Sequence, residues 1–290
     1  MFIGIDHGTT AIRFASETGE FKISRMKARD FSCSQLERLA PLEEIEGIAV
    51  CYSMGDGLTE IRPIGRVKNR GVISQKGAGE HVGGGTRVYD EIAASGLPAV
   101  VIPGLHRDSP TDRRFRVYSH QASPEKIGIA YEVVHDLGPD VVISDVSSNT
   151  VSLLVSQNRI VGAIDACIFA PGTTQGAIDV DAIRRIDEGR ITANSAFQRA
   201  GVNYHLPPED RIPALSLFSA MECAALQMLN PSSKVALTGS MAPFIAPEVK
   251  GLLRQNIAVY DEWCAARGLV RIAHDVFNGG RDILGIGVDL

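Results

Sequence analysis

The sequence has no excess of positive charge. Its 34 Asp and Glu residues outnumber its 29 Lys and Arg residues, so the formal net charge is -5 at pH 7. Proteins that bind nucleic acids usually present a broad basic surface to the phosphate backbone. The densest basic run, residues 107–116, also contains Asp108 and Asp112, and we interpret it as a solvated loop. The composition therefore argues against a nucleic-acid-binding function.

Cysteine pairs with metal-ligand or redox spacing are absent as well. The five cysteines lie far apart in the sequence, and no two are separated by only two residues. This spacing excludes a C-x-x-C zinc site and a dithiol redox motif. Cys51 and Cys167 lie in apolar, strand-like runs, so we expect both to be small core residues.

Long apolar runs are missing too. None approaches the roughly 20 residues that a membrane-spanning helix requires. The chain opens directly on a strand-like segment, which leaves no room for a signal peptide. We therefore expect a soluble, cytoplasmic protein with no membrane partner. At 290 residues the chain exceeds the usual size of a single hydrophobic core, which predicts two domains.

Several common enzyme motifs do not occur. There is no G-x-x-x-x-G-K-[ST] phosphate loop, and Gly77, Gly79 and Gly83 have the wrong spacing for a dinucleotide fingerprint. Ser53 and Ser240 lack the pattern of a hydrolase nucleophile elbow. The glycine-rich stretch 71–87 is either a flexible surface loop or a loop that offers N–H groups to an anion, and the sequence leaves both readings open.

Two segments far apart in the chain follow one pattern. Residues 2–15 and 141–155 each read as an apolar strand ending near an Asp, a turn of small or hydroxyl-bearing residues, and a second apolar strand. This pattern predicts a β-hairpin whose tip exposes N–H groups and hydroxyls beside a carboxylate. Such a tip can bind an anionic oxygen, and the carboxylate can hold Mg²⁺ or its waters. Repetition at half the chain length indicates two lobes built from related halves.

A third segment, residues 234–243, is a strand running into a Thr-Gly-Ser turn. Together the three segments resemble the superfamily of acetate and sugar kinases, heat-shock ATPases and actin. The resemblance implies an α/β, two-lobed, actin-like ATPase (ribonuclease H-like) fold with ATP and Mg²⁺ as cofactors. We expect each lobe to hold a mixed five-stranded sheet flanked by helices, with lobes at 1–138 and 139–290.

The resemblance also assigns the binding residues. It implies a first phosphate motif, a second phosphate motif and an adenosine motif, with Asp6 and Asp145 as the metal-binding carboxylates. The nucleotide-binding residues so implied are Asp6, Gly8, Thr9 and Thr10, then Ser147, Ser148 and Asn149, and then Thr238, Gly239 and Ser240.

A narrower resemblance concerns the chemistry. Residues 69–72 and 83–89 are similar to stretches of butyrate kinases, and the segment around His120 has a counterpart there. As a whole the sequence most closely resembles an uncharacterised archaeal family, methanogenesis marker protein 12. Asp145, Arg70 and His120 are the catalytic residues that this resemblance implies. A guanidinium fork suits phosphate or carboxylate, and a histidine can donate a hydrogen bond near pH 7. Arg70 could equally be a surface charge and His120 a structural residue.

These patterns predict an ATP-dependent phosphotransferase acting on a small carboxylate. The alternative is a nucleotide-dependent switch or ATPase that acts through a protein partner in methanogen metabolism. The alternative is favoured by His7, a bulky residue in a turn where acetate-type kinases have small ones, and by the short chain. The resemblance further implies a homodimer, and the helix around Phe218 and Met221 could contribute to its interface.

The coarse secondary structure follows from periodicity. Strands are predicted at 48–52 and 99–102. A helix is predicted over 125–137 with Gly138 as its cap, and others over 177–188, 215–229 and 248–267. We expect the methionines of the 215–229 helix to be core residues.

Overall fold

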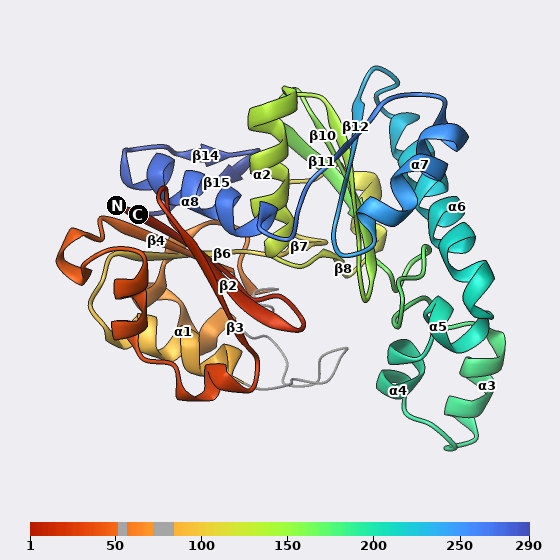
Figure 1. Ribbon diagram of the computed structural model, residues 1–290, viewed down its shortest axis with the longest axis horizontal. Coiled ribbons are helices and arrows are strands. Elements are labelled where there is room, and N and C mark those ends of the chain that lie inside the picture. The colour runs from red at the N-terminus through yellow and green to blue at the C-terminus, as the bar shows by residue number, and fades with distance from the viewer. Residues whose placement is uncertain (52–56, 72–83) are drawn as a thin grey trace. The chain divides into compact units, whose positions relative to one another are not determined.

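The computed structural model describes residues 1–51, 57–71 and 84–290, so most of the glycine-rich stretch lies outside the described residues. The described chain divides into two compact units (Figure 1). Unit 1 comprises residues 1–51, 57–71, 84–136 and 263–290, and unit 2 comprises residues 137–262. The last 28 residues therefore do not follow the predicted division, because they pack with the N-terminal part of the chain.

Unit 1 is built on a mixed six-stranded sheet, one strand more than predicted. Its first two strands form the predicted antiparallel hairpin. On the other side of β1 lies β4, which runs parallel to it. In spatial order the strands are β3 (Glu20–Ser24), β2 (Ala11–Ala15), β1 (Phe2–Asp6), β4 (Gly47–Cys51), β6 (Ala99–Ile102) and β5 (Arg62–Pro63).

Smaller elements complete unit 1. The helices are α1 (Gly85–Ala94), α2 (Glu125–Leu137) and α8 (Cys264–Phe277). The 3₁₀ helices are η1 (Lys27–Asp30), η2 (Cys33–Arg38), η3 (Leu42–Glu44), η5 (Ile64–Arg66), η6 (Lys68–Gly71) and η7 (Arg113–Val117). Two antiparallel ribbons pair β7 (Leu105–His106) with β8 (His120–Ala122) and β14 (Asp282–Ile283) with β15 (Ile286–Gly287).

Strand β1 is fully buried because both of its faces are covered. On one face its isoleucines join an apolar cluster that includes Phe14 and Phe31, whose rings stack with centroids 5.3 Å apart. On the other face Gly4 lies against α8, where a Cβ would come within 2.7 Å of the Val270 backbone nitrogen. The glycine thus allows a helix to approach the strand closely enough to bury it.

Unit 2 holds the predicted mixed five-stranded sheet with its central strand buried along its whole length. In spatial order the strands are β11 (Arg159–Ile164), β10 (Thr150–Ser156), β9 (Val141–Val146), β12 (Lys234–Thr238) and β13 (Ile257–Val259). Strands β9 and β10 form the second predicted hairpin, and β12 runs parallel to β9. The helices are α3 (Val180–Asp187), α4 (Ala193–Gln198), α5 (Val202–His205), α6 (Pro208–Gln227) and α7 (Ala242–Leu253).

The predicted single helix over 248–267 is wrong. Helix α7 ends at Leu253, because Arg254 has the left-handed conformation with a φ of 53°. The β-branched and apolar residues of β13 then extend the sheet beside β12, and α8 starts only at Cys264. The helical pattern of the sequence thus hides strand β13, because its partner β12 lies about 20 residues earlier in the chain.

Three expected core residues lie at the surface. Met221 is 46% exposed and Met228 is 81% exposed, although both belong to the apolar helix α6 or its end. Cys167 is exposed, whereas Cys51 is buried as predicted. Among the residues that the structure describes, no helix combines the length and apolarity needed to cross a membrane.

The crossing of α2 and α8 depends on glycine. A Cβ at Gly268 of α8 would lie 2.7 Å from the carbonyl carbon of Gly128 in α2. We expect Gly268→Ala to lower the free energy of unfolding by about 1–3 kcal/mol. Gly251→Ala in α7 is the matched control, since nothing lies within 4 Å of its Cβ position, and it should raise stability by about 0.5–1 kcal/mol. Urea unfolding followed by circular dichroism measures both, and equal effects would contradict this account.

Candidate functional site

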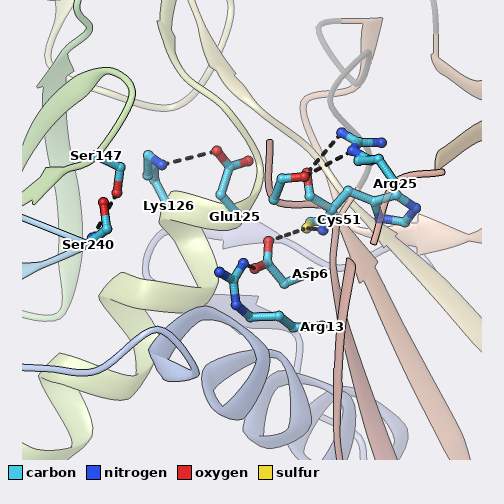
Figure 2. A network of polar contacts seen from close by, with 10 residues as sticks. Asp6, Arg13, Arg25, Cys51, Glu125, Lys126, Ser147 and Ser240 are labelled. Carbon is cyan, nitrogen blue, oxygen red and sulfur yellow. Dashed lines mark hydrogen bonds and ion pairs between the residues drawn. The ribbon is translucent and has the colours of Figure 1, made fainter. Parts of the chain in front are cut away.

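Strand β1 of the first hairpin ends at Asp6, whose carboxylate is buried. Asp6 lies opposite Arg13 in the strand register, and its Oδ2 accepts a hydrogen bond from Arg13 Nη1 at 3.3 Å (Figure 2). Gly8 follows in the turn, where a Cβ would lie 2.6 Å from the same Arg13 nitrogen. Thr9 and Thr10 are exposed at the tip. The tip therefore has the small and hydroxyl-bearing residues predicted for an anion site, above an ion pair that the sequence reasoning missed.

Cys51 contacts the other oxygen of Asp6. Its thiol donates to Asp6 Oδ1 at 3.7 Å, and the His7 backbone N–H donates to Cys51 Sγ at 3.2 Å (Figure 2). Burial, reinforced by the charge of Asp6, raises the pKa of the Cys51 thiol well above its ordinary value. The sulfur therefore stays protonated and serves as a hydrogen-bond donor rather than a nucleophile.

His7 joins the turn to the start of α1. Its ring is buried, and its Nε2 donates to the Gly85 carbonyl at 3.2 Å. Burial, together with the nearby Arg25 guanidinium, lowers the pKa of His7 to about 3. Arg25 in turn donates from Nε to the Gly8 carbonyl at 3.0 Å and from Nη2 to the His7 carbonyl at 3.3 Å. The imidazole is thus a neutral structural donor, which explains why this turn tolerates a bulky residue.

The two remaining catalytic candidates of unit 1 occupy different surroundings. Arg70 has a φ of 53° and forms a two-pronged ion pair with Asp90 of α1, with Nε–Oδ1 and Nη2–Oδ2 distances of 2.7 Å. His120 is the first residue of β8 and pairs with His106 of β7. The structure therefore gives Arg70 a carboxylate partner within its own unit, and it places His120 in a β-ribbon.

Unit 2 brings five predicted residues together. Asp145 near the end of β9 is paired in register with Thr238 at the end of β12. Gly239 follows with a φ of 91°, and a Cβ there would lie 2.6 Å from Ser147 Oγ. The Ser240 backbone N–H donates to that same Ser147 hydroxyl at 3.0 Å (Figure 2). The expected adenosine turn thus lies directly against the expected phosphate hairpin.

The loop of residues 171–175 closes over the second hairpin tip. The backbone N–H of Thr173 donates to the Ser147 carbonyl at 2.9 Å, and that of Thr174 donates to the Ser148 carbonyl at 3.1 Å. Gly172 lies so close that a Cβ would come within 2.5 Å of the Asn149 carbonyl carbon. Because these carbonyl oxygens are occupied, they present less negative potential to an approaching anion.

The donor groups of the described residues bear on metal binding. Across residues 1–51, 57–71 and 84–290, no cluster of three or more His, Cys, Asp or Glu side chains could hold a metal ion. Asp6 and Asp145 each offer one buried carboxylate. A single carboxylate fits an ion such as Mg²⁺, which keeps several of its waters and takes other ligands from substrate phosphates. The predicted Mg²⁺ role of these two residues stays a prediction.

No protein-family model matches this chain. The chain is 43% identical to the UPF0285 protein Mbar_A0208 of Methanosarcina barkeri, over 99% of each chain. It is 44% identical to the UPF0285 protein MJ1370 of Methanocaldococcus jannaschii, over 99% of this chain and 98% of that one. Among solved structures, an activator of 2-hydroxyisocaproyl-CoA dehydratase from Clostridium difficile is similar at a TM-score of 0.50 and 13% identity, over 96% of this chain and 95% of the other. This likeness bears on the fold alone, and it confirms the predicted actin-like ATPase fold.

Gly239 allows the contact between the two motifs of unit 2, and its replacement tests that contact. Gly239→Ala should destabilise the protein more than Gly279→Ala. Both residues have a positive φ, 91° and 96°, but nothing lies within 4 Å of a Cβ at Gly279. Each substitution should carry the roughly 1–2 kcal/mol cost of a left-handed alanine, and Gly239→Ala should add a clash with Ser147. Thermal unfolding compares the two, and equal melting temperatures would show that the contact is loose.

Proposed function

This chain belongs to the UPF0285 protein family, and we propose that it binds ATP together with Mg²⁺ and acts through that nucleotide. One observation carries the proposal, namely the direct contact of the Thr238–Ser240 turn with Ser147 of the second hairpin. An adenosine motif and a phosphate motif have to lie this close to act on one nucleotide. The similar dehydratase activator was solved with bound ADPNP, which supports the same ligand class.

The proposed roles follow the chemistry of each group. The hydroxyls of Ser147 and Ser148 and the backbone N–H groups of Ser148 and Asn149 would bind phosphate oxygens, with Gly8, Thr9 and Thr10 in the same role in unit 1. Gly239 and Ser240 would contact the adenosine. Asp6 and Asp145 would hold Mg²⁺ or its waters, and Mg²⁺ would neutralise phosphate charge during transfer.

The first candidate output is phosphoryl transfer to a short carboxylate. It is supported by the butyrate-kinase-like stretches at Arg70, residues 83–86 and His120. Phosphoryl transfer relies on cations that are positioned to stabilise the transferred group. Arg70 could take this part only by giving up its ion pair with Asp90.

The second candidate output is a nucleotide-dependent ATPase or switch read by a protein partner. The ion pair of Arg70 with Asp90 favours it, because that guanidinium already has a carboxylate partner. The dehydratase activator with the similar fold is named for acting on another protein, which also favours it. Of the two outputs, the geometry of the described residues supports this one better.

We also propose that two copies of the chain associate through α6. From residue 212 to residue 233 the sequence has one charged residue, Glu222, and that residue is fully buried. The outer side of this stretch presents Leu217, Met221 and Met228, which are 45%, 46% and 81% exposed. A helix that is apolar on all sides normally has all sides covered. In a twofold dimer the same apolar face would cover itself.

Nucleotide binding is tested by thermal unfolding with and without ATP and Mg²⁺. Ligand at 100 times its Kd should stabilise the protein by about 2.7 kcal/mol. Asp145→Asn should keep the melting temperature of the free protein and reduce the shift with Mg·ATP. An unchanged melting temperature at saturating nucleotide would overturn the proposal. Phosphoryl transfer and simple hydrolysis are then distinguished by measuring ATP turnover with a panel of short carboxylates. Hydroxylamine in the assay traps any acyl phosphate that a kinase forms.

Arg70→Ala and His120→Ala separate the two outputs in that assay. In a kinase, loss of either donor should lower kcat on the order of 10²–10³-fold with little change in ATP affinity. In a switch, basal hydrolysis should be unchanged in both variants.

Dimerisation is tested by sedimentation at micromolar concentration. The unmodified protein should sediment as a dimer, and Met221→Asp should sediment as a monomer with its fold intact. Met26→Asp is the matched control, because Met26 is 70% exposed in unit 1 and away from α6 in sequence. A monomeric unmodified protein, or a dimer that survives Met221→Asp, would refute the α6 interface.

A further inference from the structure

Glu222 is a carboxyl group buried inside unit 2. It lies on the inner side of α6, has no exposed surface, and is the one charged residue between 212 and 233. Its Oε1 accepts a hydrogen bond from the Ala170 backbone N–H at 3.0 Å. Among the described residues, its Oε2 has no hydrogen-bond partner. An ionised oxygen in that position would be costly, because burial removes it from bulk solvent and the Ser152 hydroxyl offsets this cost only in part.

The surroundings of Glu222 are polar, and in the part of the chain that the structure describes no cation is among the groups that shift its pKa. Hydroxyls from three elements meet there, with Ser144 Oγ on β9 lying 2.9 Å from both Ser152 Oγ on β10 and Ser219 Oγ on α6. The charged or titratable groups that act on this cluster are Asp165, which follows β11, and the Cys223 thiol on α6.

These surroundings keep the carboxyl neutral. Burial, with a smaller contribution from the charge of Asp165, raises the pKa of Glu222 to about 8, against the opposing effects of Ser152 and the Ala170 N–H. In the unfolded chain the same group titrates near 4.5. The folded protein thus holds a proton that the unfolded chain releases between these values. The stability that this bound proton contributes is fully present below about pH 4.5. It falls as pH rises above 4.5 and is lost by about pH 8.

Glu222 anchors the loop that covers the second hairpin tip. Ala170, its partner, is followed by Pro171, whose carbonyl accepts from Thr150 Oγ1 at 2.8 Å. The next residues donate to the tip, Thr173 N–H to the Ser147 carbonyl and Thr174 N–H to the Ser148 carbonyl. A continuous set of hydrogen bonds therefore joins the α6 carboxyl to the turn that is proposed to bind phosphate.

We propose that Glu222 is a positioning residue, whose neutral carboxyl holds Ala170 and the 171–175 loop against the 147–149 turn, and that loss of its proton loosens this turn. A deprotonated Glu222 would lie buried, and the charge of Asp165 would oppose it further. Opening of the loop lets the charge reach water and returns the carboxyl to its ordinary pKa of 4.5. Between that value and about 8, each pH unit therefore favours the open form by up to about tenfold, and the gain levels off above about 8. The consequence for ligand affinity rests on the nucleotide binding proposed above.

Amide hydrogen exchange of the nucleotide-free protein tests the first part. Between pH 6.5 and 9, after correction for intrinsic exchange, protection at residues 147–149 and 172–175 should fall about tenfold by pH 9 relative to pH 7. Glu222→Gln keeps an acceptor for Ala170 and cannot ionise, so its protection should be independent of pH. Glu222→Leu should lose protection at every pH. Glu209→Gln, an exposed acid on the same helix, should behave like the unmodified protein.

Titration calorimetry with Mg·ATP over the same pH range tests the second part. The Kd of the unmodified protein should rise from pH 7 to pH 9 in proportion to the fraction of the closed form that is lost, up to about tenfold, and that of Glu222→Gln should change less than twofold. Equal pH profiles of the unmodified protein and Glu222→Gln in hydrogen exchange would overturn the positioning role. If exchange follows the expected pattern but ATP does not bind at any pH, the proposed nucleotide function fails and the role of Glu222 in holding the turn stands. If Glu222→Gln does not fold, loss of protection spread over all of unit 2 in the unmodified protein would still refute the proposal.

Discussion

The parallel pairing of β9 with β12 is the constraint on which the candidate site depends. It aligns Asp145 with Thr238, so that the turns after both strands start at the same edge of the sheet. Only a residue without a side chain fits the next position, where Gly239 lies against Ser147. This contact brings the Ser240 N–H within hydrogen-bond distance of Ser147. The 171–175 loop then donates to the carbonyls of the same hairpin tip. The sheet register, rather than any one side chain, assembles this part of the molecule.

The two hairpins show how one backbone pattern acquires different chemistry. In unit 1 the residue opposite Asp6 is Arg13, so the carboxylate is paired within the hairpin itself. In unit 2 the residue opposite Asp145 is the apolar Val151. An ion pair of this kind reduces the charge that the first carboxylate can offer to a ligand. The repeated segments therefore differ in whether the hairpin itself supplies an ionic partner for its carboxylate, which the repeat of small turn residues does not reveal.

Sequence patterns correctly predicted the elements that are stabilised by neighbours in the sequence. Helix α2 spans the predicted residues 125–137, and Gly138 ends it with a φ of 102°, because helix formation and capping involve neighbours in the sequence. Both hairpins were predicted for the same reason. The break between α7 and α8 was missed, because β13 owes its conformation to pairing with β12. Helix α6 carries apolar residues on every side, so periodicity alone could not tell that Met221 and the following Met228 face outward.

The same distinction applies to the candidate site. Resemblance to known motifs supplied Asp145, Ser147 and Gly239, and the structure brings them into contact. Arg13 carried a usable signal, since a hairpin register places it opposite Asp6. Arg25, Cys51 and Glu222 carried none. Each acts through a backbone or side-chain group that is distant in the chain, and only the folded arrangement reveals the partner.

The return of residues 263–290 to unit 1 affects the order in which the chain can fold on the ribosome. The described part of unit 2 is one continuous stretch, so all of its strands are available once residue 262 has emerged. Unit 1 starts earlier but lacks α8, and β1 keeps one apolar face open until residues 264–277 arrive. Domains of a nascent chain usually mature from the N-terminus onward. Here the N-terminal sheet is completed only by a late segment, and its exposed strand has to be kept from other chains until residues 264–277 are available.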